Sequence, residues 1–144
     1  CPEVYADSLR AARDAFEVAV TVMGATVTGD GDDDIEAALL PTKASLAFYI
    51  GGMGAKRRNF HMELMSRMGF EAEAHEIQEL FFAGERERAI PLVPTAFADE
   101  IALVGSPARI RDRLAAWHDT PVTTLIVGTR DVNTLRAFAE LVLA

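Results

Sequence analysis

The stretch Phe-Glu-Val-Ala-Val-Thr-Val-Met-Gly-Ala-Thr-Val-Thr, at residues 16–28, decides the fold class of this chain. It is rich in β-branched residues and almost free of charge, which is typical of a strand buried on both faces of a sheet. A second run of this kind, Val-Thr-Thr-Leu-Ile-Val, lies at residues 122–127. Two buried strands joined by a long helical excursion predict parallel neighbours in an α/β fold.

The residues around and between the two strands carry helical spacing, with start and stop signals at glycine, proline and aspartate. The helices are predicted over residues 4–13, 35–50, 57–68, 70–83, 95–102, 107–118 and 132–143. Pro41 lies inside the second of these and is expected to bend or break it. Residues 85–89 are predicted to be a short charged link. Gly105, Ser106 and Pro107 predict a compact helix start, with a stop, a cap and a proline in the first turn.

Composition and charge limit the classes of function. The chain has 144 residues, 50% of them hydrophobic, which fits a single domain with one packed core. Its formal net charge of −8 argues against nucleic-acid binding and against docking on an anionic membrane. One cysteine cannot form an internal disulfide, no apolar run is long enough for a membrane helix, and no signal peptide is visible. These features predict a cytoplasmic protein.

The most distinctive segment is Tyr-Ile-Gly-Gly-Met-Gly-Ala-Lys-Arg-Arg-Asn-Phe at residues 49–60, which we call the glycine–basic block. Its glycines, Gly51, Gly52 and Gly54, allow bare backbone to approach another surface. Its cations, which begin with Lys56 and Arg57, are the densest positive charge in an acidic chain. The block predicts either a contact with an anionic ligand or a helix that ends on glycine before a solvated helix start.

Two acidic patterns in the sequence resemble parts of metal sites. Asp30, Asp32 and Asp34 resemble the opening of a calcium loop, but Ile35 stands where that loop needs glycine. A capped helix start is the better interpretation of these aspartates. Glu71, His75 and Glu79 share one helical face, yet no partner cluster is visible elsewhere in the sequence. A solvated charged face is expected there.

The glycine–basic block is also where the chain resembles a known family, the luciferase-like flavin or deazaflavin oxidoreductases of the bacterial luciferase superfamily. The resemblance rests on Tyr-Ile-Gly-Gly-Met-Gly-Ala-Lys followed by Asn59 and Phe60. It continues through five further segments: residues 76–80, Ala83 with Gly84, Val93 with Pro94, residues 99–105 and residues 122–127. It covers nearly the whole chain and is closest for the deazaflavin-dependent subgroup.

This resemblance implies a (β/α)8 TIM barrel of more than twice the present length. The chain, residues 1–144, would be a single segment from the C-terminal part of that barrel, with the two strands as the seventh and eighth. The helical excursion would be a large insertion between them. Ligands of such barrels bind at the C-terminal ends of the strands, and phosphates often lie near the last two loops. Those loops would be residues 29–31 and 128–130.

The resemblance further implies hydride transfer to or from a small organic substrate, with a deazaflavin coenzyme or, alternatively, FMN, as in a monooxygenase. The cofactor would be bound mainly by residues outside this chain, and the fragment alone would be inactive. No residue of the chain is identified as catalytic. Gly51, Gly52, Gly54, Lys56 and Arg57 are the predicted contacts to an anionic cofactor tail or substrate.

A different class of function remains open from the sequence. The chain is then a non-catalytic helical interaction domain whose apolar faces and strand edges bind a protein partner or a second copy. Because two strands alone do not make a stable sheet, another chain or the rest of a barrel is expected to cover them. A homodimer is predicted on this ground.

Overall fold

The computed structural model describes residues 19–54, 59–118 and 120–143. The predicted helix at residues 4–13 and the start of the strand at residues 16–18 lie outside this part of the chain. The protein divides into two compact units. Residues Cys1–Ala38 and Ile101–Ala144 form the first, which we call the α/β unit, and Leu39–Glu100 form the second, which we call the helical unit.

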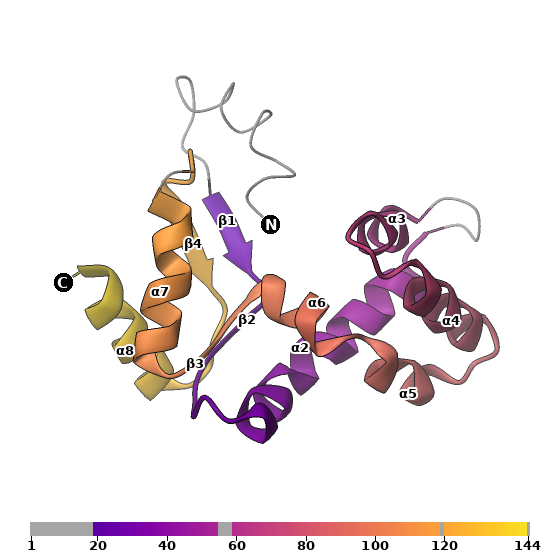
Figure 1. Cartoon of the computed structure of the whole chain (residues 1–144), viewed down its shortest axis with the longest axis horizontal. Helices are drawn as coiled ribbons and strands as arrows, with labels where there is room; N and C mark the ends of the chain where they lie inside the picture. Colours follow the sequence, from indigo (N-terminus) through magenta and orange to yellow (C-terminus); the bar gives the residue numbers. More distant parts are fainter. Residues whose placement is uncertain (1–18, 55–58, 119, 144) are drawn as a thin grey trace. The chain divides into compact units, whose positions relative to one another are not determined.

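The α/β unit contains four short parallel strands arranged in two pairs (Figure 1). β1 (Ala19–Val22) pairs with β4 (Thr124–Val127), with Ala19 opposite Thr124. β2 (Gly24–Val27) pairs with β3 (Ala102–Gly105), with Gly24 opposite Ala102. The prediction of parallel strands in an α/β fold, with a helical excursion between them, is therefore confirmed.

The prediction of one continuous strand over residues 16–28 is wrong for its described part. The extended segment changes partner at Met23, whose backbone amide donates to the carbonyl of Ile101 at 3.2 Å. The hydrogen-bond ladder is interrupted at this residue because β4 pairs before it and β3 pairs after it.

The sequence prediction also missed β3, since it continued the helix from Thr95 to residue 102. α6 (Thr95–Glu100) ends two residues earlier, and β3 begins at Ala102. A short apolar run such as Ala-Leu-Val-Gly fits a buried strand and a buried helix end equally well by periodicity. Pairing with β2, more than 70 residues earlier in the chain, decides between them.

Burial differs among the strands. All four residues of β3 are buried, whereas β1 and β4 alternate between exposed and covered positions. The prediction that residues 16–28 and 122–127 are buried on both faces is therefore wrong for β1 and β4. Within the described residues, only one face of this pair has a partner layer, and Ile126 on the other face is 49% exposed.

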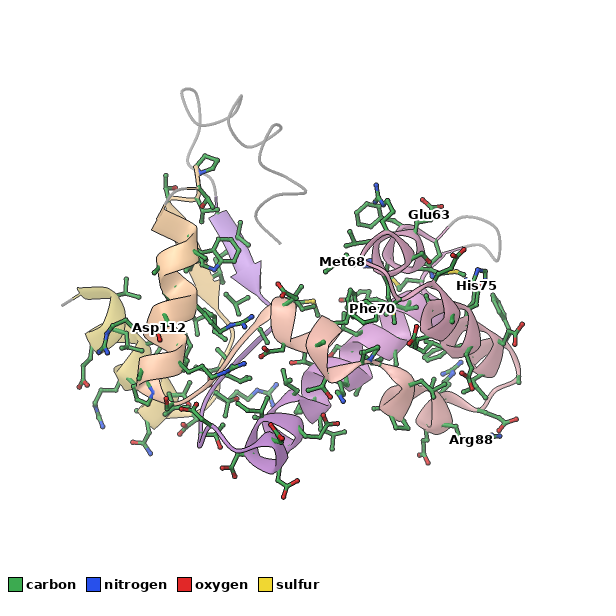
Figure 2. The ribbon with its side chains drawn as sticks, in the orientation of Figure 1. Glu63, Met68, Phe70, His75, Arg88 and Asp112 are labelled. Carbon is green, nitrogen blue, oxygen red and sulfur yellow. The ribbon has the colours of Figure 1, made fainter. Side chains whose placement is uncertain are left out.

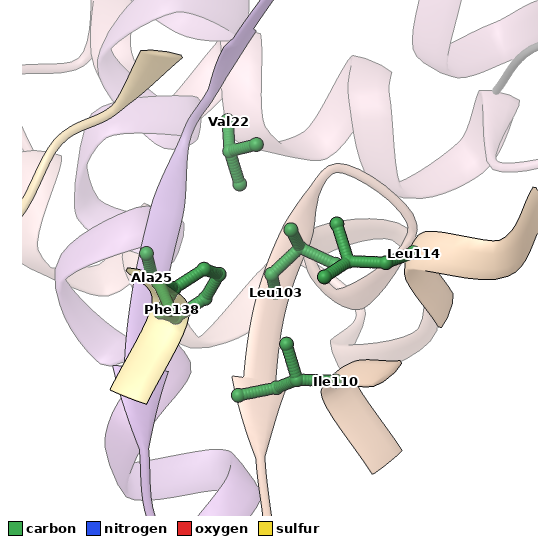
Figure 3. Packing of buried hydrophobic residues seen from close by; sticks show 6 residues of the cluster. All are labelled: Val22, Ala25, Leu103, Ile110, Leu114 and Phe138. Atoms are coloured by element: carbon green, nitrogen blue, oxygen red, sulfur yellow. The ribbon is translucent and has the colours of Figure 1, made fainter. Parts of the chain in front are cut away.

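The core of the α/β unit lies between the strands and two helices, α7 (Pro107–His118) and α8 (Val132–Leu143). Its buried side chains are Val22, Ala25, Leu103, Ile110, Leu114 and Phe138 (Figure 3). They come from three strands, β1, β2 and β3, and from both helices. Each of β3 and β4 is followed by one of these helices, so the C-terminal part of the chain consists of two consecutive strand–helix repeats. Both helices have the bounds that the sequence predicted.

The helical unit contains most of α2 (Asp32–Gly52), the whole of four shorter α-helices and one 3-10 helix. These are α3 (Phe60–Arg67), α4 (Glu71–Phe82), α5 (Arg86–Ala89), η1 (Ile90–Leu92) and α6. The predicted link at residues 85–89 is therefore largely helical. The fully buried side chains of the helical unit include Ile50, Met65, Ile77 and Val93. None of the helices within the described residues is long and apolar enough to cross a membrane.

α2 continues through Pro41 without a break. The helix is also longer than predicted at both ends, since it begins at Asp32 and ends at Gly52. Leu39, Leu46, Ala47 and Ile50 are buried, as its apolar pattern predicts. The apolar pattern of the sequence also includes Leu40, which is 55% exposed. Two adjacent helical residues point about 100° apart, which is why only one of the two leucines faces the core.

A buried cation ties α2 to α6. Lys43 is only 2% exposed, and its Nζ donates to Oγ1 of Thr95 at 3.0 Å. Since burying an ammonium group is costly without hydrogen bonds, this contact anchors the helix firmly within the helical unit.

Candidate functional site

Two regions correspond to the ligand sites that the sequence predicts: the loops at the C-terminal ends of the strands, and the glycine–basic block. The first region belongs to the α/β unit and the second to the helical unit. Each is described below from its own contacts.

At the end of β3, Asp30 binds the start of α7. Its Oδ1 accepts a hydrogen bond from the backbone amide of Ser106 at 2.7 Å. Hydrogen bonds from the Ser106 side chain and amide, with the charge of Arg109 adding to them, lower the pKa of Asp30. Ser106 itself caps the helix, because its Oγ accepts from the amide of Arg109 at 3.2 Å. The predicted stop, cap and proline start of this helix is confirmed.

Gly105 makes this arrangement possible. Its φ of +121° lies in the region that favours glycine, and a Cβ there would meet Oδ1 of Asp30 at 2.9 Å and Cδ of Arg109 at 2.7 Å. The guanidinium of Arg109 also donates to the carbonyl of Val104. The junction between β3 and α7 is thus closed by the chain's own polar groups.

The end of β4 is arranged in the same way. Oδ1 of Asp131 accepts from the amide of Asn133 at 3.2 Å, and Oδ2 accepts from the amide of Thr134 at 2.8 Å. These bonds, that of Thr134 first, lower the pKa of Asp131. Thr134 is buried, and its Oγ1 accepts from the amide of Val27 at 3.3 Å, which fastens α8 to β2.

Aspartate carboxylates therefore bind the N-termini of both helices that follow these strands. An N-terminus of this kind is a ready-made anion site because its amides point outward and the helix dipole favours negative charge. Here Asp30 and Asp131 supply that negative charge, so these helix starts do not fit a phosphate. Asp30 lies within the loop at residues 29–31, and Asp131 directly follows the loop at residues 128–130, so both carboxylates are visible in the sequence.

The lowered pKa of Asp30 predicts how stability depends on pH. Because this pKa lies below the ordinary value of 3.8, the ionised carboxylate stabilises the fold above that pH, and the effect is lost as pH falls through the lower, folded-state pKa. We expect Asp30→Asn to unfold at lower urea concentration than the wild type at pH 7, and this difference to shrink as the pH falls below 3.8. Asp112→Asn, at an exposed position of α7, is the control. A difference that persists unchanged at pH 3 would contradict the assignment.

The second region, the glycine–basic block, begins in the last turn of α2. Gly51 is buried and Gly52 is exposed, and both belong to the helix, which ends at Gly52. Gly54 has a φ of +118°, a conformation that glycine adopts readily. Lys56 and Arg57 lie outside the described residues. The predicted helix end on glycine is confirmed, and the predicted cofactor contacts of these five residues stay predictions.

Gly51 has a packing role within the helical unit. A Cβ at this position would lie 2.3 Å from Cδ2 and 2.7 Å from Cβ of Phe81 on α4. At Gly52 the nearest atom, Cε1 of Phe81, would be 3.1 Å away. Gly51 therefore lets α2 and α4 approach closely. This gives the residue a structural reason that does not require a ligand.

Asn59 joins the two ends of the block. It is 4% exposed, and its Nδ2 donates to the carbonyls of Tyr49, at 3.2 Å, and Ile50, at 2.6 Å. Its Oδ1 accepts from the amides of His61, at 3.0 Å, and Met62, at 3.1 Å. One side chain thus satisfies the last turn of α2 and the first turn of α3. Asn59 was part of the quoted motif, but its role as the cap of α3 was not predicted.

Four rings near Asn59 form a row of contacts. Phe48 meets Tyr49 at 5.8 Å between centroids, Tyr49 meets His61 at 4.9 Å, and His61 meets Phe60 at 5.5 Å. The two outer rings are solvent-accessible, with Phe48 48% and Phe60 54% exposed. The helical unit therefore presents apolar rings on both sides of the sequence that carries Lys56 and Arg57.

The charged face of α4 is exposed to solvent, as the sequence predicts. Glu71, His75 and Glu79 are all exposed, and Figure 2 labels His75 among the outward side chains of this helix. Among the described residues, no group of three histidine, cysteine, aspartate or glutamate side chains is arranged to hold a metal ion.

The packing of Gly51 predicts the cost of a single methyl group. Gly51→Ala should lower the free energy of unfolding by roughly 1–2 kcal/mol, because overpacking outweighs the gain of about 1 kcal/mol in helix propensity. In a Phe81→Ala background the same change should cost much less. Gly52→Ala is the matched control on the same helix. Equal costs at Gly51 with and without the ring, measured by chemical denaturation, would rule out this packing role.

Comparison with known proteins connects these features to a family. The family model described as luciferase-like monooxygenase matches residues 2–124. A Mycobacterium tuberculosis protein with the provisional name coenzyme F420-dependent oxidoreductase is 33% identical over 133 residues. The match covers 92% of this chain but 37% of that relative. No solved structure is significantly similar.

The matched region takes in the glycine–basic block and the segments from Glu76 to Gly105 on which the sequence resemblance also rests, and it ends at Thr124, within the last of those segments. The chain belongs to the luciferase-like monooxygenase family.

Proposed function

We propose that this chain is the C-terminal part of a deazaflavin-dependent oxidoreductase, in which it helps to bind the cofactor or the organic substrate. The observation that carries the proposal is the 33% identity, over 133 residues, to a relative named for dependence on coenzyme F420. FMN is the alternative cofactor, since the family name covers monooxygenases.

The strand arrangement supports a barrel as the intact fold. β3 and β4 are each followed by a helix, and every pairing among the described strands is parallel. Repeated strand–helix units with parallel pairing are the construction of a (β/α)8 barrel. Two-stranded sheets are marginal by themselves, so further strands of such a barrel would complete them.

The cofactor would supply the redox chemistry, a hydride transfer, and the protein would bind and orient it. The starts of α7 and α8 do not fit an anionic cofactor tail because Asp30 and Asp131 already occupy them. The glycine–basic block fits in charge, since it supplies Lys56 and Arg57 between residues whose positions Asn59 stabilises. We therefore assign the tail or an anionic substrate to this block, with Gly51, Gly52 and Gly54 beside it.

Titration of the intact protein with the deazaflavin coenzyme and, separately, with FMN tests this function. Fluorescence or absorbance should show saturable binding of the deazaflavin at lower concentration than FMN. Lys56→Ala and Arg57→Ala should each raise the dissociation constant roughly tenfold, the effect of losing one charge-assisted hydrogen bond.

Arg67→Ala, which removes an exposed cation from α3, is the matched control and should leave the dissociation constant unchanged. Binding that is equally tight in all variants would remove Lys56 and Arg57 from the site. Failure of the wild type to bind either cofactor would refute the proposed function itself.

The exposed rings of the helical unit favour a second role, self-association as a homodimer. Phe48 and Phe60 are each about half exposed and belong to one row of ring contacts. Exposed aromatic side chains in contact with one another are typical of protein interaction surfaces. We propose that a second copy covers this row.

Sedimentation velocity tests the dimer. The wild-type chain should sediment as a dimer at micromolar concentration, and Phe48→Ser with Phe60→Ser should shift it to the monomer. Val132→Ser, which removes an exposed apolar side chain from α8, is the control. A monomeric wild type, or a dimer that survives the double substitution, would contradict this interface.

A further inference from the structure

α2 is the element that belongs to both compact units. It runs over Asp32–Gly52, and the boundary between the units falls between Ala38 and Leu39, inside the helix. The chain crosses the same boundary again between Glu100 and Ile101. The helical unit is therefore connected to the α/β unit by two covalent crossings, one of them helical.

The helix lacks a hydrogen bond at this boundary. In an α-helix the amide of residue 41 would donate to the carbonyl of residue 37. Residue 41 is proline, which has no amide hydrogen and whose ring also crowds that carbonyl. Ala37 belongs to the α/β unit and Pro41 to the helical unit. The missing bond is thus one that would have joined the two units along the helix.

A second contact acts on the turn that follows, residues 41–45. The hydroxyl of Ser45 donates to the carbonyl of Pro41 at 3.1 Å. Back-bonding of a serine hydroxyl to the carbonyl four residues earlier favours a bend in a helix. Leu40 is 55% exposed and Pro41 is exposed as well, so the turn at residues 37–41 is solvated on one side. Pro41 weakens the turn of residues 37–41, and Ser45 acts on the next turn, which begins at Pro41.

The helix is well anchored on both sides of this turn. Towards its start, Ile35 is buried, and its amide donates to the carbonyl of Gly31 at 3.0 Å. Towards its end, Lys43 binds Thr95, and Ala47 and Ile50 are fully buried. A weakened turn between two anchored segments is the construction of a hinge, in which a few residues absorb the change in backbone angles.

The second crossing is also short. α6 ends at Glu100 and β3 begins at Ala102, which leaves Ile101 as the single linking residue. The carbonyl of Ile101 accepts from Met23, so this residue is held in the α/β unit. Rotation at this crossing is therefore confined to one or two backbone bonds.

We propose that residues 37–41 of α2 form a hinge about which the helical unit, with the glycine–basic block, reorients as one body relative to the α/β unit. The hinge is independent of the cofactor assignment. It rests on the position of Pro41 at the unit boundary, on the contact of Ser45, and on the anchors to either side.

Distances between spin labels on the two units test the hinge in the 144-residue chain. With Cys1→Ser as background, cysteines would replace Glu76 on α4 and Arg111 on α7, both exposed. We expect a broad distance distribution between these labels in the parent. Pro41→Ala, which restores the amide donor, should narrow it, and adding Ser45→Ala should narrow it further.

Leu40→Ala is the matched control, because it changes an exposed residue of the same turn but leaves the backbone donors intact; it should keep the parent width. Labels within one unit, at Glu63 and Glu76, set the width expected without a hinge. A parent distribution as narrow as that pair, or a width that Pro41→Ala leaves unchanged or increases, would overturn the proposal. Circular dichroism verifies that each variant is folded.

Discussion

The parallel pairing of β2 with β3 is the interaction on which the rest of the structure depends. It joins Gly24–Val27 to Ala102–Gly105 and so closes the long helical excursion between them. The register places Ala25 beside Leu103, and both belong to the core that α7 and α8 cover. Closing so long a loop costs chain entropy, which the burial of this core offsets. Because β2 precedes the helical unit and β3 follows it, this pairing also brings together the two chain segments that lead into and out of that unit.

The same pairing arranges the strand ends. It brings the loop after β2 to the start of α7, where the Asp30 carboxylate binds Ser106. Asp131 does the corresponding work at α8. Negative charge is thereby built into the place where barrels often bind phosphate. The densest run of positive charge in the sequence, Lys56, Arg57 and Arg58, lies instead in the glycine–basic block. This run of cations is the reason for our proposal that an anionic ligand binds at the glycine–basic block rather than at the strand ends.

Gly51 and Asn59 show how one motif serves two purposes. Gly51 lets α2 pack on Phe81, and Asn59 links the end of α2 to the start of α3. Both residues are explained by folding, whereas Lys56 and Arg57 lie outside the described residues. The structural residues of the motif thus position the neighbourhood of the cations. The hinge in α2 then concerns the orientation of the whole unit that carries them.

The sequence by itself determined the α/β class, the parallel strands, the bounds of α7 and α8 and the helix end at the glycines, because these follow from local pattern and from glycine and proline geometry. It also determined the family. Only the tertiary structure decided that residues 102–105 are a strand, that the first strand divides at Met23, and that Leu40 faces solvent while Lys43 is buried. The physical reason is the same in each case. A short apolar run, a leucine or a lysine has no fixed conformation or burial until residues distant in the chain provide its hydrogen bonds and packing partners.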